Sequence, residues 1–201
     1  LAEEIRRVVP VIRELRGLGV PISIDTTKPE VMQAALEAGA VMVNDIGALQ
    51  SPGSAQVVAR HRAGVCLMHM QGQPRTMQVA PHYDDVVSEV AAFLAKRTAH
   101  ALAAGIAAEA ILVDPGFGFG KSPAHNLELL RRLDALTTLG FPVLAGLSRK
   151  STLGAITGRT VHERLHASVA AALIAVQHGA SVVRVHDVAA TRDALLVWSA
   201  A

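Results

Sequence analysis

Short apolar runs alternate with helical patterns along the whole chain, and the alternation occurs six times. The apolar runs cover residues 21–25, 40–46, 64–70, 110–114, 141–148 and 180–186. They are continuously apolar, which is typical of strands that are buried on both faces of a parallel sheet. The pattern therefore predicts an α/β fold made of strand–helix units, either a barrel or an open sheet.

Helix signals fill the gaps between these runs. Residues 1–16 form an amphipathic pattern that leads into the first run. Further helix starts are predicted at Thr27-x-x-Glu30 with Pro29, at Ser122-Pro123 and at Thr160-x-x-Glu163, with helix ends at Gly39, near Gly140 and at Gly179. The first and third of these starts have the spacing of a capping box. No linker or low-complexity tract divides the chain, so we expect residues 1–201 to form one domain.

Composition excludes several functional classes. A hydrophobic content of 51% with 18% charged residues indicates a globular protein rather than a disordered one. No apolar run approaches the ~18 residues that a membrane span needs. Only 3% of the residues are aromatic and the net charge is +2 without any basic run, so no nucleic-acid partner is expected. The lone Cys66 is expected to be a small core residue in a reducing, cytoplasmic setting.

Polar residues gather at the carboxyl ends of the apolar runs. They are Asp25, Asn44 with Asp45, His69, Asp114, Ser148-Arg149-Lys150, Arg184 and His186. In a parallel sheet these ends share one face, which is where α/β barrels place their chemistry. No strand is followed by the GxGxxG pattern of dinucleotide-binding folds, and the glycines of residues 116–120 have the wrong spacing for it. A TIM barrel is therefore favoured over an open sheet.

The residue types at these ends indicate the kind of ligand. Arginine, lysine and histidine side chains suit an anion such as a phosphate. Carboxylates next to an amide, as at Asp25, Asn44 and Asp114, suit a heterocycle with amino and ring N–H groups. Met68 and Phe119 could cover the faces of a flat ring. The residues alone thus predict a small, planar, nitrogen-rich substrate with a phosphate-like tail.

The chain resembles the dihydropteroate synthases over essentially its whole length. The motifs that carry the resemblance are IDTTKPEVMQAALEAGAVMVNDI, CLMHMQGQPRTMQ, ILVDPGFGFGKSPAHN, GLSRKS and VVRVHDV, in that family's order. The resemblance implies a TIM barrel of which this chain carries about the last six strands. It also implies a transferase of folate biosynthesis, working as a homodimer, that joins 6-hydroxymethyl-7,8-dihydropterin diphosphate to p-aminobenzoate and releases diphosphate.

The resemblance also implies a role for each matching residue. The expected pterin ligands are Asp25, Asn44, Met68, Asp114 and Lys150; the diphosphate ligands are Arg184 and His186; and p-aminobenzoate would be flanked by Phe119, Ser148 and Arg149. Lys150, Arg184 and His186 are the expected catalytic residues, because charge on the leaving diphosphate must be stabilised, whereas an arylamine is already nucleophilic. Gly116, Gly118 and Gly120 are expected to leave room for the ligands.

Two other functions stay open at this point. A pterin-binding methyltransferase of the methyltetrahydrofolate:corrinoid type resembles this family in its Asp and Asn contacts, but it has no use for a diphosphate site. A non-catalytic module that binds a pterin or a phosphate is the other alternative. Turnover with p-aminobenzoate distinguishes all three functions.

Several polar residues are expected to be structural. Asp45 is expected to cap or pair locally, and His69 could either touch ligand or not. No metal site is expected among the remaining histidines, including His162 and His166. The small-residue segment ASVAAALIAV, residues 167–176, could form a dimer contact or pack in the core.

Six strand runs are fewer than a TIM barrel needs, since such a barrel has eight strands and typically ~250 residues. The resembling family has two further strand–helix units upstream, the first with an asparagine that binds Mg²⁺. No NVTPDSF-like or GGESTRPG-like segment occurs in this chain. We therefore expect an N-terminally incomplete synthase that lacks roughly 60–80 residues, has no Mg²⁺ ligand of its own and shows no magnesium-dependent turnover in isolation.

Overall fold

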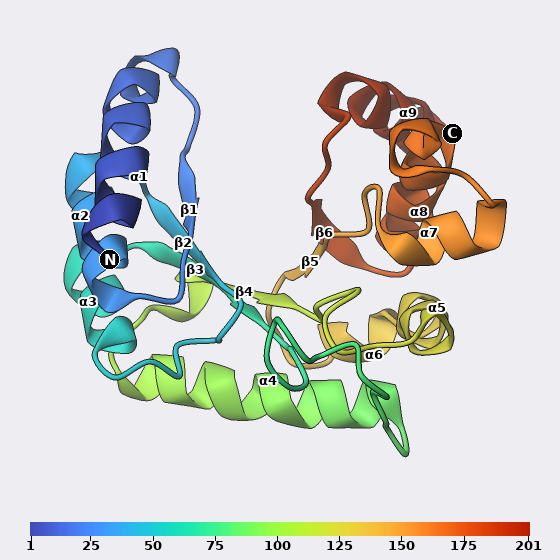
Figure 1. Cartoon of the computed structure of the whole chain (residues 1–201), viewed down its shortest axis with the longest axis horizontal. Coiled ribbons are helices and arrows are strands. Elements are labelled where there is room, and N and C mark those ends of the chain that lie inside the picture. Colours follow the sequence, from blue (N-terminus) through green and yellow to red (C-terminus); the bar gives the residue numbers. More distant parts are fainter. The chain divides into compact units, whose positions relative to one another are not determined.

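The computed structural model describes residues Leu1–Ala201 and contains six β-strands (Figure 1). They are β1 (Ser23–Asp25), β2 (Met42–Asp45), β3 (Gly64–Met68), β4 (Ile111–Asp114), β5 (Val143–Ala145) and β6 (Ala180–Val183). Each of the six predicted strands is confirmed, although each is shorter than its apolar run.

Helices separate the strands, as the pattern predicts. The α-helices are α1 (Ala2–Leu15), α2 (Pro29–Ala38), α3 (Ser54–His61), α4 (Val86–Ala103), α5 (Pro123–Arg131), α6 (Asp134–Thr137), α7 (Ser151–Thr157), α8 (Leu165–Gln177) and α9 (Val188–Ala200). Short 3-10 turns are η1 (Arg16–Leu18), η2 (Ala108–Ala110) and η3 (Val161–Glu163). No helix is both long and apolar enough to cross a membrane.

The chain divides into two compact units, which are described separately. Unit 1 comprises residues Leu1–His69 and Phe93–Val113. Its strands follow chain order from β1 to β4, and β1, β2 and β3 pair in parallel. The side chains of Val43 and Val65 are fully buried, as expected of strands covered on both faces. Helix α1 packs against α2, and α2 against α3, along this sheet (Figure 1).

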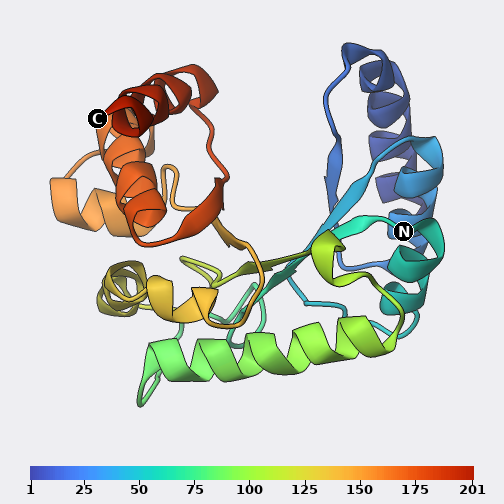
Figure 2. The same cartoon turned by 180° about the vertical axis from the view of Figure 1, so that it is seen from behind.

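Unit 2 comprises residues Met70–Ala92 and Asp114–Ala201. Strands β5 and β6 pair in parallel, with a register shift between Val143 and Leu144. Helix α8 packs on β6 and on α9 (Figure 2). The small residues Ser168, Ala171, Ala172 and Ala175 of α8 are buried, so this part of the small-residue segment packs in the core.

Of the two predicted capping boxes, one is wrong and the other is confirmed. The residue before α2 is Lys28, and no side chain caps this helix end, so the capping box predicted at Thr27 is wrong. Thr26 takes the local role instead, because its Oγ1 accepts from the Lys28 N–H at 3.2 Å. The capping box between Thr160 and Glu163 is confirmed, although it encloses η3 and the α-helix begins only at Leu165.

The helix predicted from Ser122 to Gly140 is divided into α5 and α6. Ser122 caps α5 together with His125, whose Nδ1 accepts from the Ser122 N–H at 3.2 Å while the His125 N–H donates to Ser122 Oγ at 3.2 Å. His125 therefore has a structural role, as expected.

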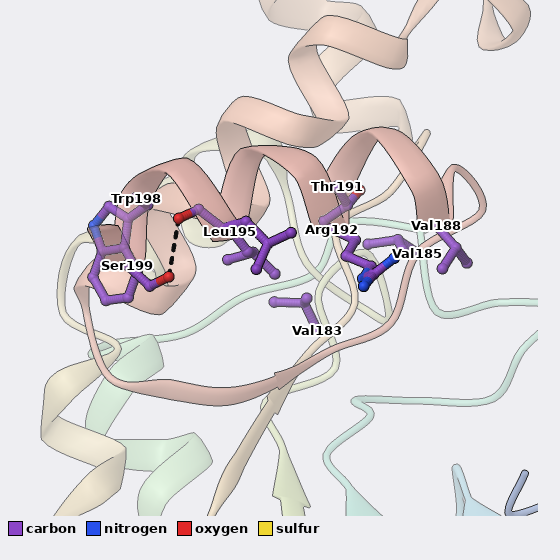
Figure 3. Close-up of a pocket in the computed structure, with 9 residues that line it drawn as sticks. Val183, Val185, Val188, Thr191, Arg192, Leu195, Trp198 and Ser199 are labelled. Carbon is purple, nitrogen blue, oxygen red and sulfur yellow. Dashed lines mark hydrogen bonds between the residues drawn. The ribbon is translucent and has the colours of Figure 1, made fainter. Parts of the chain in front are cut away.

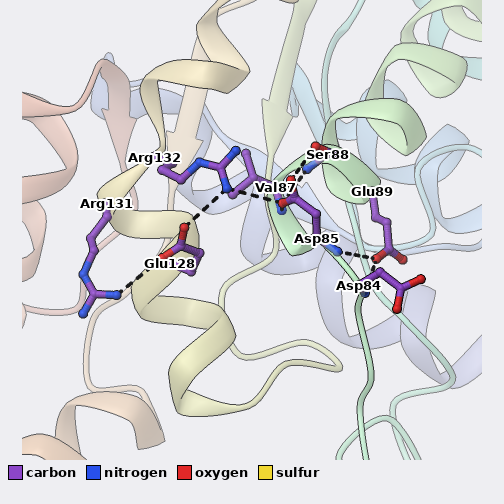
Figure 4. Close-up of polar contacts among 8 residues, drawn as sticks. All are labelled: Asp84, Asp85, Val87, Ser88, Glu89, Glu128, Arg131 and Arg132. Atoms are coloured by element: carbon purple, nitrogen blue, oxygen red, sulfur yellow. Dashed lines mark hydrogen bonds and ion pairs between the residues drawn. The ribbon is translucent and has the colours of Figure 1, made fainter.

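The start of α4 lies in a charged cluster that joins it to α5 (Figure 4). Asp85 accepts from the backbone N–H of Val87 at 3.0 Å and from Ser88 Oγ at 2.8 Å, which caps the helix and lowers the pKa of the Asp85 carboxyl. Arg132 reaches Glu128 at 3.3 Å and Asp85 at 3.5 Å. These side chains are exposed, so the cluster orients the two helices more than it stabilises them.

Candidate active site

Three strands end in an aspartate, but the basic site residues lie beyond the strands. Asp25, Asp45 and Asp114 are the last residues of β1, β2 and β4. Residues 148–150 come after β5 has ended at Ala145, and residues 184–186 come after β6 has ended at Val183. The predicted position of Arg149 and Lys150 after the strand is confirmed, whereas the run predicted over 180–186 is too long, because Arg184 and His186 lie in the loop after β6.

In unit 1, Asp25 and Asn44 form the predicted carboxylate–amide pair. The register of β1 and β2 places them directly opposite each other. The Asn44 side-chain amide donates to Asp25 Oδ2 at 2.8 Å, which fixes the orientation of both groups. Asp25 is exposed, whereas Asn44 is only 5% exposed. Met68, which is expected to cover the pterin, ends β3 and is fully buried.

Asp45 has the local role that the sequence predicts. Its carboxylate accepts from the backbone N–H of Gly47 at 2.7 Å and of Leu49 at 2.8 Å. Burial raises the pKa of this carboxyl, and these backbone donors act against the rise. Arg97 donates to the carbonyl oxygens of Ala48 and Leu49 at 2.7 and 2.8 Å. Together these bonds hold Ala48 and Leu49 at positive φ, a conformation that side chains other than glycine adopt rarely.

His69 lies directly after β3 and is buried. Its ring packs edge-to-face on Phe93, with 4.9 Å between the ring centroids. This contact accounts for the position of the ring without a ligand.

In unit 2, Asp114 is paired with a residue that is expected to bind the other end of the substrate. One carboxylate oxygen accepts from the Gly116 N–H at 2.7 Å, and the other from Arg184 Nη2 at 3.2 Å. Asp114 is 1% exposed, so burial raises the pKa of its carboxyl, while Arg184 and Lys150 act in the opposite direction. The expected pterin carboxylate and an expected diphosphate ligand therefore form an ion pair.

Lys150 bends over the loop that follows β4. Its Nζ donates to the carbonyl oxygen of Phe117 and lies 4.8 Å from the centroid of the Phe119 ring. Burial lowers the pKa of Lys150 to about 8, against the attraction of Asp114. A solvated surface lysine would show none of these contacts.

The remaining predicted residues of unit 2 pair with the segment that follows β6. Ser148 Oγ lies 2.9 Å from His186 Nδ1 and also accepts from the His186 backbone N–H at 3.1 Å. Arg149 donates from Nε and Nη2 to Asp187 at 3.1 and 2.5 Å. The two loops are thus joined by paired contacts, one of which is a bidentate ion pair.

Gly118 and Gly120 have a different role from the one predicted, whereas the role of Gly116 stays a prediction. Gly118 and Gly120 have positive φ angles of 79° and 64°. A Cβ on Gly120 would lie 2.3 Å from the carbonyl oxygen of Gln71, and one on Gly118 would lie 3.2 Å from the Lys150 side chain. These glycines therefore allow tight packing of protein against protein, and at Gly120 they leave no space for a ligand.

Two functional candidates are absent from the sequence prediction. Lys121 is 2% exposed, although it follows the glycine loop in a position that looks exposed in sequence. Asp187, the partner of Arg149, stands directly after His186 in the motif VVRVHDV. Lys121 could have been found from its position between a glycine loop and a Ser-Pro helix start. Asp187 could have been found because it is adjacent to the predicted ligand His186.

An apolar cavity of about 410 Å³ lies between β6 and α9 (Figure 3). Its lining residues are Val183, Val185, Val188, Thr191, Arg192, Leu195, Leu196, Trp198 and Ser199. Val183 and Val185 line it, whereas Arg184 and His186 contact Asp114 and Ser148, so side chains continue to alternate past the end of the strand. Arg184 and His186 therefore lie on the side away from the cavity, and the largely aliphatic cavity is a poor match for a charged substrate.

Polar residues at the carboxyl ends of parallel strands are typical of α/β barrel enzymes. Comparison with known proteins identifies the family. The family model for pterin binding enzymes matches residues 1–186. A dihydropteroate synthase from Neisseria meningitidis serogroup B is 52% identical over 98% of this chain and 72% of its own length. The chain belongs to the dihydropteroate synthase family.

Solved structures agree with this assignment. A dihydropteroate synthase from Stenotrophomonas maltophilia has a TM-score of 0.97 and 58% identity, and the match covers 100% of this chain and 76% of that one. The synthase from Xanthomonas albilineans in complex with 7,8-dihydropteroate has a TM-score of 0.93 and 55% identity, over 99% and 74% of the two chains. These matches confirm the predicted fold class, an α/β barrel of which this chain carries six strands. They favour the synthase over the methyltransferase and over a non-catalytic module.

Proposed function

We propose that this chain joins the methylene carbon of 6-hydroxymethyl-7,8-dihydropterin diphosphate to the amino group of p-aminobenzoate, with release of diphosphate. The observation that carries the proposal is the ion pair between the buried Asp114 carboxylate and the exposed Arg184 side chain. It brings a carboxylate suited to pterin N–H groups next to a guanidinium suited to a phosphate. A substrate with a nitrogen-rich ring and an anionic tail matches both groups.

Asp114 is proposed to bind the pterin ring. Gly116 N–H holds one carboxylate oxygen, and Arg184 occupies the other. A pterin amino group and ring N–H could replace the Arg184 contact, because the diphosphate tail gives the guanidinium a stronger anionic partner. Substrate binding would then exchange one partner of Asp114 for another and leave no buried charge unpaired.

Asp25, Asn44 and Met68 are proposed as further pterin contacts, as the family's motifs imply. The Asn44–Asp25 hydrogen bond supports this role, since it preorients a carboxylate and an amide without any ligand. Lys150 is proposed to contact the pterin as well, which requires its Nζ to exchange the Phe117 carbonyl for the ligand. With a pKa of about 8, its ammonium is mostly protonated at neutral pH.

Arg184 and His186 are proposed to bind the diphosphate and to stabilise it as it leaves. In the reaction the C–O bond to diphosphate breaks, with the electron pair going to the leaving oxygen, and the arylamine nitrogen forms the new C–N bond. The amine then loses a proton to the diphosphate or to water. Positive charge next to the departing oxygens lowers the barrier, and no general base is required because the amine is already nucleophilic.

Phe119, Ser148 and Arg149 are proposed to flank p-aminobenzoate. Phe119 offers a ring face that already carries the Lys150 ammonium, and Ser148 is oriented by His186. Arg149 is held by Asp187 with a positive φ of 57°. Such paired contacts favour a defined loop conformation, which positioning of a second substrate requires.

Mg²⁺, which the resemblance implies, does not fit the residues of this chain. Mg²⁺ takes oxygen ligands in octahedral geometry. No group of three or more His, Cys, Asp or Glu side chains is placed to hold a metal ion. Asp114 and Asp25, the acidic candidates, are engaged by Arg184 and Asn44. No step is therefore assigned to the ion. Its involvement is proposed only through the asparagine of the family's upstream strand–helix units.

A homodimer and a cytoplasmic location are also proposed. The exposed face of α8, with His166, Ala170 and Ile174, supports the first, and the buried Cys66, which forms no disulfide, is compatible with the second. Light scattering on the purified protein measures its mass in solution and tests the dimer.

Turnover tests the proposed function directly. The natural gene product that contains residues 1–201 is supplied with the pterin diphosphate, and released diphosphate is measured with and without p-aminobenzoate. We expect release that depends on p-aminobenzoate and yields 7,8-dihydropteroate. Methyl transfer from methyltetrahydrofolate to a corrinoid, or binding of the pterin diphosphate without product, would contradict the proposal.

A further inference from the structure

The glycine loop, defined as residues 116–120, is fixed mainly by side chains. Phe119 N–H donates to Gly116 O in a turn, and side chains bind every carbonyl oxygen of the loop. Lys121 Nζ donates to Gly116 O at 3.0 Å and to Phe119 O at 3.1 Å, Lys150 Nζ to Phe117 O, Gln78 Nε2 to Gly118 O at 2.5 Å, and Tyr83 Oη to Gly120 O at 2.8 Å. A loop with flexible glycines therefore has a defined conformation.

Lys121 is the residue that binds two of these carbonyls at once. Its side chain turns back over the loop and is almost fully buried, with its Nζ 6.0 Å from the centroid of the Tyr83 ring. Burial lowers its pKa to about 7, while Asp114 acts in the opposite direction. A buried ammonium is costly unless it is hydrogen-bonded, so its two carbonyl partners are essential to its position.

The two carbonyls that Lys121 binds belong to the parts of the loop that face different substrates. Gly116 holds Asp114 through its N–H, and Asp114 is the proposed pterin ligand. Phe119 carries the ring that is proposed to flank p-aminobenzoate. A single side chain therefore joins the supports of two proposed subsites.

We propose that Lys121 is a positioning residue, whose buried ammonium clamps Gly116 to Phe119 and so fixes the spacing between the pterin carboxylate and the arylamine subsite. This inference rests on the proposed function. Lys121 does not touch the reacting atoms in it. Its loss should weaken the binding of both substrates more than it slows the chemical step at saturation.

The test is Lys121→Met, which keeps the length of the side chain and removes its charge and donors. Lys96→Met is the matched control, because Lys96 is exposed on α4. In the natural gene product, we expect Lys121→Met to raise the KM for p-aminobenzoate by roughly tenfold, less than the hundredfold that an ångström of misplacement can cost. We expect kcat to change less than KM, and the control to change neither.

Amide hydrogen exchange tests the clamp without any substrate. The N–H groups of Gly116 and Gly118 donate to Asp114 at 2.7 Å and to Asn126 at 2.8 Å. Both should exchange faster in Lys121→Met than in the control, while the amides of β4 keep their wild-type rates. If the Met variant does not fold, Lys121→Gln, which retains a donor without charge, is measured in its place.

Three results would overturn the inference. They are unchanged loop exchange in the variant, an unchanged KM with a lowered kcat, and a loss of global stability with both KM and loop exchange unchanged. Failure of the proposed function is distinguishable, because it would appear as absent turnover in the wild-type protein and would leave the exchange experiment intact.

Discussion

Two loops of this protein begin in the same way and end with different roles. The loop after β2 follows Asp45, the last residue of that strand, and the loop after β4 follows Asp114 in the same way. Both aspartates are buried, and each accepts the backbone N–H two residues later at 2.7 Å. In both loops, a cationic side chain donates to two backbone carbonyls: Arg97 in the first and Lys121 in the second.

The difference lies in the second carboxylate oxygen. In Asp45 it accepts the Leu49 backbone N–H, which is part of the fold. In Asp114 it accepts Arg184, a side chain that a ligand can draw away. A strand-end aspartate in a barrel is therefore structural when backbone groups occupy both oxygens. In the proposed function, Asp114 is available for substrate because one of its oxygens is held by a side chain and not by the backbone.

The largest effect is expected for Asp114→Asn. An amide has only one acceptor oxygen, so its NH₂ would face either the Gly116 N–H or the pterin N–H groups, and the affinity for the pterin should fall by about 2–4 kcal/mol. The fold should persist, because the residue ends a strand and its loop keeps the carbonyl contacts. Calorimetric titration of a pterin into the folded variant measures the change. Unchanged affinity would remove Asp114 from the site.

Asp45→Asn should lower the stability of the fold and leave the affinity for pterin unchanged. One of the two buried N–H groups, of Gly47 or of Leu49, would face an amide NH₂, which should lower the free energy of unfolding by about 1–3 kcal/mol. The affinity of the folded fraction for pterin should stay close to that of the wild-type protein. Urea unfolding and the same titration give both quantities. A loss of affinity without a loss of stability would contradict the comparison.

Arg184→Ala should weaken binding of the diphosphate end of the substrate and not of its pterin end. Binding of the pterin diphosphate should weaken by about 1–3 kcal/mol, because a charge-assisted contact to the tail is lost. A pterin without the tail should bind about as well as before. If the tail-less pterin loses affinity to the same extent, Arg184 reads the ring or supports the fold instead.

A further effect, on stability and not on ligand affinity, is expected in the pH dependence of unfolding. Burial lowers the pKa of Lys121 to about 7 and of Lys150 to about 8, below the ordinary value of 10.5. Between these values and 10.5 the unfolded chain binds more protons than the folded chain, so stability should rise with pH. At lower pH both lysines are protonated in both states, and this contribution no longer changes.

Urea unfolding over that pH range measures the slope. In Lys121→Met the rise should begin only near the pKa of Lys150, whereas Lys96→Met should keep the wild-type slope. A stability that falls through this range in the wild-type protein, with no difference between the variants, would contradict the assignment of buried lysines.

The sequence predicted the strands well because continuous apolar runs are a local signal. It also predicted the carboxylate–amide pair of Asp25 and Asn44, which their hydrogen bond confirms, whereas the shared diphosphate role of Arg184 and His186 stays a prediction. It failed at α2, where the Thr27 spacing imitates a capping box although Lys28 precedes the helix. Sequence spacing cannot show whether a side chain or the backbone turn satisfies a helix end.

The loop contacts could not be predicted because their partners are distant in sequence. Arg149 and Asp187 are 38 positions apart, and Lys150 and Phe117 are 33 apart. The burial of Lys121 depends on carbonyls that only the folded loop brings together. For the same reason the local pattern around Asp45 and Asp114 does not distinguish the two aspartates, and the ligand role expected for Asp114 rests on the resemblance to a family.

A crystal structure of the natural gene product with the pterin diphosphate bound tests the central claim most directly. The account predicts that pterin N–H groups have replaced Arg184 on Asp114, that Arg184 contacts the diphosphate, and that Asp45 still binds the N–H groups of Gly47 and Leu49. A complex in which Arg184 remains on Asp114, with the pterin ring bound elsewhere, would contradict it.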